Sequence, residues 1–197
     1  MSKRSKPLSA RIPARESASI VLLPDAGPLI TLAYADALDV LFKPGWSVHI
    51  VDMVLHEVSR NLTPTSEKIQ RWVVTNKLFI SPTQTFKRYN KMLGKTALQI
   101  KKSNLGELAI QESMNKLALA LPETTGIFLF EDHKIARASF FLPDNCRKIS
   151  TRAYLLFLEQ HGWLGKASSA ADIERTAIRN GRKFSQLRFP PDWWTLK

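Results

Sequence analysis

The chain has 197 residues, of which 44% are hydrophobic and 23% are charged, and these proportions are those of a soluble globular protein. Its formal net charge of +12 favours polyanionic partners: nucleic acid, an acidic protein or an anionic membrane surface. Cys146 is the one cysteine, which excludes an internal disulfide, a thiol redox pair and a structural zinc site, and favours a reducing cytoplasm. No apolar run approaches the roughly 20 residues that span a bilayer.

The first 18 residues are strongly basic. They carry five basic residues and one acidic residue, and they lack the apolar core of a secretory signal. We therefore expect a disordered tail over residues 1–18. A single globular domain is expected over 19–165, followed by an extension over 166–197 that packs on the domain or on a partner.

Beyond the tail, short apolar runs alternate with stretches of helical period. The first apolar run ends at Pro24 and Asp25, and Pro28 suits the first turn of the next helix, where no backbone donor is lost. Asp52 is expected to cap the second helix. The first half of the chain predicts, in order, a strand at 20–23, a helix at 27–41, a strand at 48–51, helices at 52–62 and 66–75, and a strand at 78–80.

The second half continues this alternation. Residues 86–102 have helical spacing, but they contain Gly94 and hold six Lys or Arg residues without an acid, so no element is assigned to them. Pro122 ends the long helix that follows. The remaining pattern predicts a helix at 104–121, a strand at 126–130, a helix at 133–141, a strand at 147–149, and helices at 151–161 and 170–178.

Strands that alternate with helices predict an α/β fold: three layers, α/β/α, around a central, mostly parallel sheet of four to five strands. In such sheets the reactive residues lie just beyond the carboxyl ends of the strands. Asp25 and Asp132 occupy such positions, and Glu57 and Glu107 lie near the starts of helices. The pattern is that of a carboxylate cluster assembled from four separate segments.

With their neighbours, these acids resemble the motifs of PIN domains, especially the toxin members of bacterial and archaeal toxin–antitoxin pairs. The resemblance extends over about residues 19–165, and four short segments carry it: 25–33, 54–58, 105–110 and 129–137. It implies a PIN-like fold and a metal-dependent endoribonuclease. It also implies that Asp25, Glu57, Glu107 and Asp132 bind Mg²⁺ or Mn²⁺, with Thr151 and Ser150 in supporting positions.

The chemistry of the residues agrees with this resemblance. Hydrolysis of a phosphodiester needs an attacking hydroxide and neutralisation of charge in the transition state, and divalent cations held by oxygen ligands provide both. The four histidines, by contrast, show no paired spacing for zinc or for a histidine-based ribonuclease. The resemblance further implies an RNA substrate, an antitoxin protein as partner, and a homodimer. No membrane partner is expected, because no apolar run is long enough to span a bilayer.

Each acid also has a purely structural interpretation. Asp25 can simply end a strand, and Glu57 can be a solvated residue of an amphipathic helix. Glu107 follows Asn104 by three residues, the spacing of a capping box. Asp132 can cap the helix that begins at the next residue, and the neighbouring Glu131 can share or replace its role.

The basic stretch before Glu107 can guide an RNA backbone toward the metal site, or it can be a solvated helical surface. The residues that we predict to bind RNA are Lys95, Lys101, Lys102, Lys134, Arg137 and Arg152. The alternative for the whole protein is a non-catalytic PIN-like module that binds nucleic acid or a protein partner through the same surface. In the extension, the adjacent Trp193 and Trp194 can pack on the domain or on a partner.

Overall fold

The computed structural model describes residues 19–93, 104–137, 141–165 and 168–189. Within these ranges the strands are β1 (Ile20–Pro24), β2 (Ser47–Val51), β3 (Phe79–Ser81), β4 (Thr125–Phe130) and β5 (Cys146–Ser150). The helices are α1 (Ala26–Tyr34), α2 (Asp52–Ser59), α3 (Pro64–Thr75), α4 (Gln84–Leu93), α5 (Leu105–Ala120), α6 (His133–Arg137), α7 (Thr151–Gln160) and α8 (Ala170–Arg179), with a short 3₁₀ helix, η1 (Leu38–Phe42).

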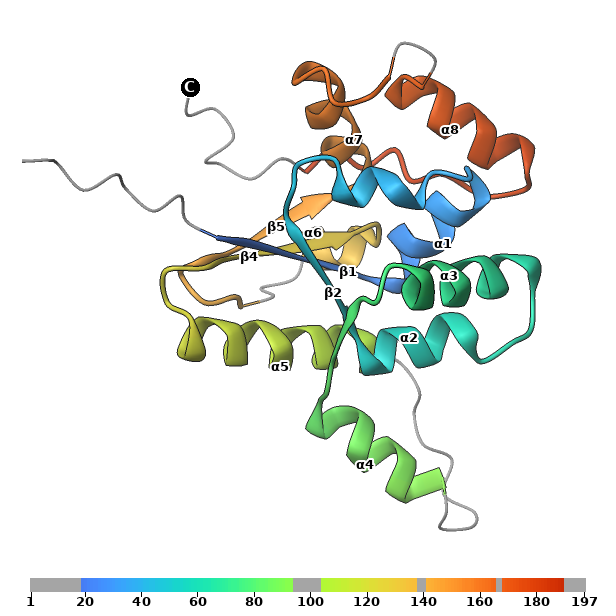
Figure 1. Cartoon of the computed structure of the whole chain (residues 1–197). Helices are drawn as coiled ribbons and strands as arrows, with labels where there is room; N and C mark the ends of the chain where they lie inside the picture. The colour runs from blue at the N-terminus through green and yellow to red at the C-terminus, as the bar shows by residue number, and fades with distance from the viewer. Residues whose placement is uncertain (1–18, 94–103, 138–140, 166–167, 190–197) are drawn as a thin grey trace, which may run out of the picture.

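The five strands form one parallel sheet in the order β3-β2-β1-β4-β5. Helix α5 lies on one face of the sheet, and α7 and α8 lie on the opposite side, so the molecule has three layers (Figure 1). The predicted α/β fold with a parallel sheet is therefore confirmed. Each predicted strand is present, and its ends differ from the prediction by at most one residue.

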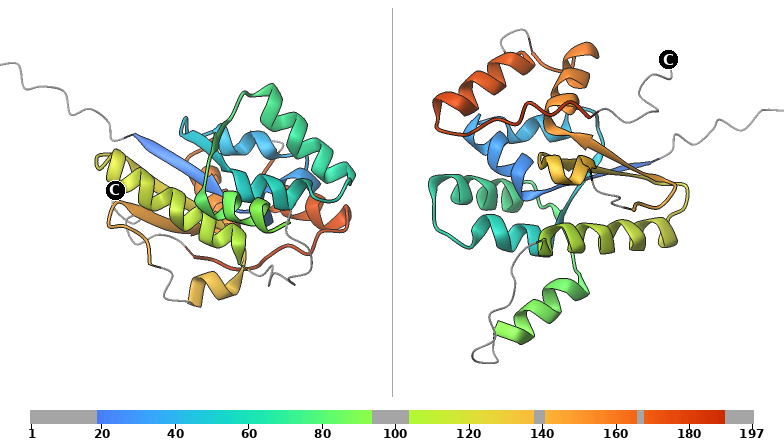
Figure 2. Two further views of the ribbon diagram at one scale, coloured as in Figure 1. Left: turned by 90° about the horizontal axis from the view of Figure 1, so that it is seen from below. Right: turned by 180° about the vertical axis from the view of Figure 1, so that it is seen from behind.

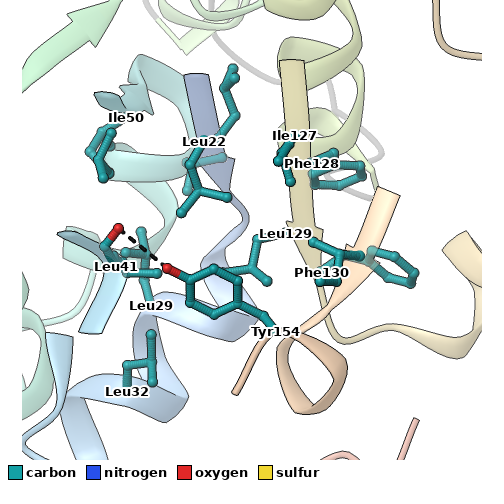
Figure 3. Close-up of a cluster of buried hydrophobic side chains, with 14 of the residues drawn as sticks. Leu22, Leu29, Leu32, Leu41, Ile50, Ile127, Phe128, Leu129, Phe130 and Tyr154 are labelled. Atoms are coloured by element: carbon teal, nitrogen blue, oxygen red, sulfur yellow. Dashed lines mark hydrogen bonds between the residues drawn. The ribbon is translucent and has the colours of Figure 1, made fainter. Parts of the chain in front are cut away.

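The core lies between the sheet and its covering helices. Leu22 and Ile127 from adjacent strands are fully buried together with Leu29 of α1 and Tyr154 of α7 (Figure 3). The Tyr154 hydroxyl is satisfied in this apolar setting because it donates to backbone carbonyls of η1, at 3.1 Å from Val40 O and 3.3 Å from Leu41 O. These contacts hold η1 and α7 against the same end of the core.

The predicted helix at 27–41 is wrong in its second half. Helix α1 ends at Tyr34, and Asp36 takes a left-handed conformation with φ of 52° before the chain enters η1. Aspartate is among the residues that tolerate this conformation. The apolar period continues through the break, because the leucines of α1 and those of η1, Leu38 and Leu41, are buried alike. Periodicity alone therefore did not show where the helix stops.

The predicted capping role of Asp52 also needs correction. Val51 is the N-cap residue of α2, and Asp52 is already inside the helix. Its carboxylate accepts hydrogen bonds from Met53 N–H and from both the backbone N–H and the hydroxyl of Thr83. Asp52 thus joins the start of α2 to the segment before α4.

Helix α4 occupies part of the stretch that the sequence left unassigned, and it projects away from the sheet (Figure 1).

Helix α8 and the segment after it, which belong to the extension, lie against the domain. Helix α8 contacts α1 and α7. The following segment runs back along the molecule toward the end of β5 (Figure 2), where Ser150 N–H donates to Phe189 O at 3.1 Å and Ser150 Oγ accepts from Phe189 N–H at 3.0 Å. Trp193 and Trp194 lie outside the described residues. In the part of the chain that the structure describes, no helix is both long and apolar enough to cross a membrane.

Candidate functional site

Asp25 and Asp132 follow β1 and β4, which are adjacent strands of the sheet. Asp25 follows β1 and is the N-cap residue of α1, and its backbone N–H donates to Leu129 O of β4 at 2.9 Å. Asp132 follows β4, the strand beside β1. The chain leaves β1 toward β2 on one side and returns to β4 on the other, so the carboxyl ends of β1 and β4 flank the point where the strand order reverses (Figure 1). Ligand sites of open α/β sheets occur at such points.

The other two acids come from helices that contact each other, α2 and α5. Glu57 of α2 accepts a hydrogen bond from Gly106 N–H at the start of α5, with 3.1 Å between N and Oε1. Glu107 lies in the first turn of α5. The interpretation of Glu57 as a merely solvated residue is therefore wrong, since its half-buried carboxylate has a specific partner.

The electrostatics of Asp25 show that the acids lie close enough to interact. Burial raises the pKa of Asp25 from its ordinary value of 3.8 to about 7. The Ala26 N–H opposes this rise by donating to the carboxylate. Negative charges from the other segments raise the pKa of Asp25 further, and they belong to Glu57, Glu107 and Glu131. Asp25 is thus the point at which the four segments converge.

Glu57 and Glu107 are perturbed in the same sense. Burial raises the pKa of Glu57, the hydrogen bond from Gly106 lowers it, and the charge of Glu107 raises it again. Burial also raises the pKa of Glu107; there the charge of Asp132 adds to the effect and that of Lys134 opposes it. These charge interactions link Asp25, Glu57 and Glu107 with one another, and they link Asp132 to this group through Glu107.

The interpretation as a helix cap is wrong for Glu107, whereas Asp132 does contact the start of a helix. Asn104 is the N-cap residue of α5, but it has a left-handed backbone with φ of 71° and makes no side-chain capping bond, so no capping box includes Glu107. Asp132 is exposed, and its Oδ1 accepts from Lys134 N–H at 2.8 Å. Asp132 thus does bind a backbone N–H at the start of α6, in addition to its charge interaction with Glu107.

Glu131 is a fifth acid of this region, and it is only 8% exposed. Its Oε2 accepts from the Thr31 hydroxyl at 2.9 Å and from Arg182 Nη2 at 3.1 Å. Its Oε1 is buried and has no hydrogen-bond partner among the described residues. The sequence pointed to Glu131 only as a neighbour of Asp132. It did not identify Thr31 or Arg182, although Thr31 belongs to the same short motif as Asp25.

Thr151 and Ser150, the predicted supporting residues, are both buried at the end of β5. The Ser150 side chain caps α7 by accepting from Ala153 N–H, and its hydroxyl donates to Leu187 O at 2.7 Å. Thr151 Oγ1 lies 3.5 Å from Phe130 O. Ser150 therefore anchors the segment after α8, while Thr151 lies beside the end of β4, the strand that leads to Asp132.

The residues predicted to bind RNA are only partly placed. Lys134 is exposed, and its charge acts on Glu107. Arg152 lies 3.7 Å from Glu174 of α8, measured between Nη2 and Oε2. Arg137 is the last residue of α6. Lys95, Lys101 and Lys102 lie outside the described residues.

A surface pocket of about 540 Å³ opens at the switch point of the sheet. Asp25, Glu131 and Asp132 line it from the domain, and the segment 182–186 lines its other side. Across the described ranges, no three His, Cys, Asp or Glu side chains are grouped closely enough to hold a metal ion together. The chemistry of the donors nevertheless fits Mg²⁺ or Mn²⁺, because carboxylate oxygens are the hard ligands that these cations prefer. The carboxylates around Asp25 repel one another, and the buried Oε1 of the neighbouring Glu131 has no hydrogen-bond partner among the described residues.

No family model and no curated protein matches this sequence. Among solved structures, the fold is similar to the PIN domain of RRP44 from T. brucei, with 14% sequence identity and a TM-score of 0.45. The similarity covers 73% of this chain and 84% of that one. At this level it carries no statement about activity.

Proposed function

We propose that this protein is a metal-dependent endoribonuclease of the PIN type, with Asp25, Glu57, Glu107 and Asp132 as its catalytic acids. The observation that carries the proposal is the electrostatic coupling of these four carboxylates at the carboxyl end of the sheet. Carboxylates that repel one another near neutral pH favour a bound cation, since the cation removes the repulsion.

The four acids would hold Mg²⁺ or Mn²⁺, and Thr151, beside the end of β4, would support them. Ser150 would support the site through the backbone, because its hydroxyl holds the start of α7 and the segment after α8. The cation supplies an activated water and neutralises charge on the phosphoryl oxygens. Asp25 is suited to a central position because charges from the other segments converge on it. Lys134 carries an exposed ammonium close enough to act on Glu107, so it can hold an RNA phosphate beside the acids.

Three of the four acids lie at the starts of helices, and this placement supports the same function. Glu57, which was predicted near a helix start, instead lies near the end of α2. Asp25 precedes α1, Glu107 lies in the first turn of α5 and Asp132 precedes α6. The partial positive charge at a helix start stabilises ionised carboxylates and anionic substrate groups alike. These positions therefore offset part of the repulsion within the cluster and favour an anionic substrate.

We further propose that the protein is the toxin of a type II toxin–antitoxin pair and that it forms a homodimer. The resemblance of the four sequence motifs supports this assignment. The net charge of +12 suits both an RNA substrate and an acidic segment of an antitoxin. A cytoplasmic location belongs to the same proposal.

An RNA-cleavage assay with Mg²⁺ or Mn²⁺ tests the function directly. The wild type should cleave RNA only when the metal is present, and Asp25→Asn should abolish cleavage while the fold persists. Asp144→Asn is the matched control, because Asp144 is exposed and lies outside the acid cluster. A wild type that binds RNA but leaves it intact with either metal would instead identify a non-catalytic binding module. A single-stranded DNA of the same sequence shows which sugar the enzyme accepts.

A further inference from the structure

Arg182, in the segment after α8, binds two residues that are far from it in sequence. Its Nη2 lies 3.1 Å from Glu131 Oε2, and its Nε donates to Thr31 Oγ1 at 2.9 Å. The Thr31 hydroxyl in turn donates to Glu131 Oε2 at 2.9 Å. The three side chains form a closed hydrogen-bonded network in which the hydroxyl accepts from the guanidinium and donates to the carboxylate.

The same segment also holds the backbone of Glu131. The Ser185 hydroxyl donates to Glu131 O at 3.0 Å. Glu131 is therefore fixed through its side chain by Arg182 and through its carbonyl by Ser185. The next residue along the chain is Asp132, so these contacts fix the loop that carries this acid between β4 and α6.

The network also reaches the start of α1. Arg182 Nη2 lies 3.4 Å from Gly27 O, and a Cβ at position 27 would lie 3.3 Å from the Cβ of Glu131. Glu131 thus packs closely against the first turn of the helix that Asp25 begins. Arg182 connects the elements that carry Asp25 and Asp132, and it compensates the charge of Glu131 by binding Oε2. The buried Oε1 of the same carboxylate has no hydrogen-bond partner among the described residues.

We propose that Arg182 is a positioning residue of the carboxylate site: by binding Glu131 and Thr31 it fixes the loop that carries Asp132 relative to α1. This inference rests on the proposed metal-dependent function, and it assigns a role to the extension in that site. Residues that orient metal ligands in this way typically change metal affinity or activity by about 10- to 100-fold when they are lost.

The test uses the full chain and compares Arg182→Met with Arg182→Lys and with the control Arg179→Met. Arg179 is exposed at the end of α8, so its loss removes the same charge without touching Glu131. Arg182→Met should weaken Mn²⁺ binding, measured by calorimetry, by about 10- to 100-fold and lower kcat for RNA cleavage by a similar factor. The KM for RNA should stay within about twofold of wild type, because Arg182 is proposed to act on the acids and not on the substrate.

Arg182→Lys should recover part of both losses, since an ammonium keeps the charge but lacks the planar fork that reaches two acceptors. Arg179→Met should behave as the wild type. All measurements are made under conditions in which each variant is folded, as shown by urea unfolding without metal. If Arg182→Met does not fold, Ser185→Ala leaves Arg182 in place and removes the hydrogen bond to Glu131 O, together with the longer one that Ser185 Oγ accepts from Leu187 N–H at 3.4 Å. It should weaken Mn²⁺ binding in the same direction.

The proposal would be overturned if folded Arg182→Met had the Mn²⁺ affinity and kcat of the wild type, because the network would then serve stability alone. If Arg182→Met does not fold, the same result in Ser185→Ala would overturn it. A wild type that binds Mn²⁺ but does not cleave RNA would refute the ribonuclease, while the calorimetric comparison still tests Arg182. A wild type that neither binds Mn²⁺ nor cleaves RNA would overturn both proposals.

Discussion

The carboxylate of Glu57 lies directly against the backbone of Gly106, which donates its N–H to Oε1 at 3.1 Å. A Cβ at position 106 would lie 2.6 Å from Glu57 Oε2 and 3.2 Å from its Cδ. A side chain at position 106 would therefore have to displace the Glu57 carboxylate from its place beside Glu107.

Gly106→Ala should therefore displace the Glu57 carboxylate and lower the rate of RNA cleavage. In a Glu57→Ala background the clash is absent, and the same Gly106→Ala change should raise the free energy of unfolding by up to about 1 kcal/mol, because alanine favours the helix over glycine. Urea unfolding of the four proteins in this cycle measures the effect. Equal changes in stability with and without the Glu57 side chain would show that the two residues are not coupled.

The raised pKa of Asp25 predicts a specific pH dependence of stability. The pKa of its carboxyl group is 3.8 in the unfolded chain and about 7 in the folded protein. Between these values the folded protein holds a proton that the unfolded chain has lost, so the free energy of unfolding decreases as pH rises from about 4 to about 7. Since one pKa unit corresponds to about 1.4 kcal/mol, the contribution amounts to a few kcal/mol.

Asp25→Asn lacks this contribution, so its stability advantage over wild type should grow across the same pH range. The measurement is urea unfolding of both proteins in chelator at several pH values. Adding Mn²⁺ should stabilise the wild type more than Asp25→Asn, because a ligand that binds only the folded state raises its stability. A constant difference between the two proteins from about pH 4 to pH 8 would contradict the perturbed state of Asp25.

The proposed toxin function predicts an effect on cell growth. Expressed alone in a bacterium, the wild type should slow growth, and Asp132→Asn should not, because Asp132 is proposed to bind the metal. The control Asp144→Asn should slow growth as the wild type does. Growth curves at matched expression levels make the comparison. Equal growth of all three strains would count against the toxin assignment and leave the cleavage assay to decide whether the protein is a nuclease.

The basic stretch before Glu107 predicts a salt-dependent effect on RNA binding. Each Lys or Arg that contacts a phosphate releases a counterion, so log affinity decreases with log salt concentration in proportion to the number of contacts. Changing Lys95, Lys101 and Lys102 to Gln should weaken binding by a similar factor for every RNA sequence. It should also reduce the salt slope by about one for each lost contact.

The control for this variant changes Lys43, Lys68 and Lys77 to Gln, which alters the net charge equally at positions outside the basic stretch. Binding is measured at several salt concentrations with catalytically inactive Asp25→Asn as the background. An unchanged slope in the first variant would mean that the stretch is a solvated surface. Lys134, Arg137 and Arg152 would then be the next candidates for the RNA path.

Much of the fold followed from local patterns in the sequence. The apolar runs of the strands and the period of the helices are properties of neighbouring residues, so every strand was predicted within one residue of its ends. Parallel strands place their carboxyl ends at one edge, and the positions of Asp25 and Asp132 after strands therefore predicted that these acids would lie near each other.

The local signals did not predict contacts that depend on how distant elements pack. The break after α1 at Asp36 leaves the apolar period intact, and Thr83, which binds the Asp52 carboxylate, lies 31 residues further along the chain. Likewise, the distance between Glu57 and Gly106 is determined by the packing of α2 on α5.

The network of Arg182, Glu131 and Thr31 is the clearest case of a relationship decided only by tertiary structure. The partners are separated by 51, 100 and 151 residues along the chain. A buried carboxylate needs a hydrogen-bonding or charged partner, but the sequence does not say which of many basic residues will reach it. That choice depends on the path of the segment after α8 across the carboxyl end of the sheet, and this path is set by the packing of α8 on α1 and α7.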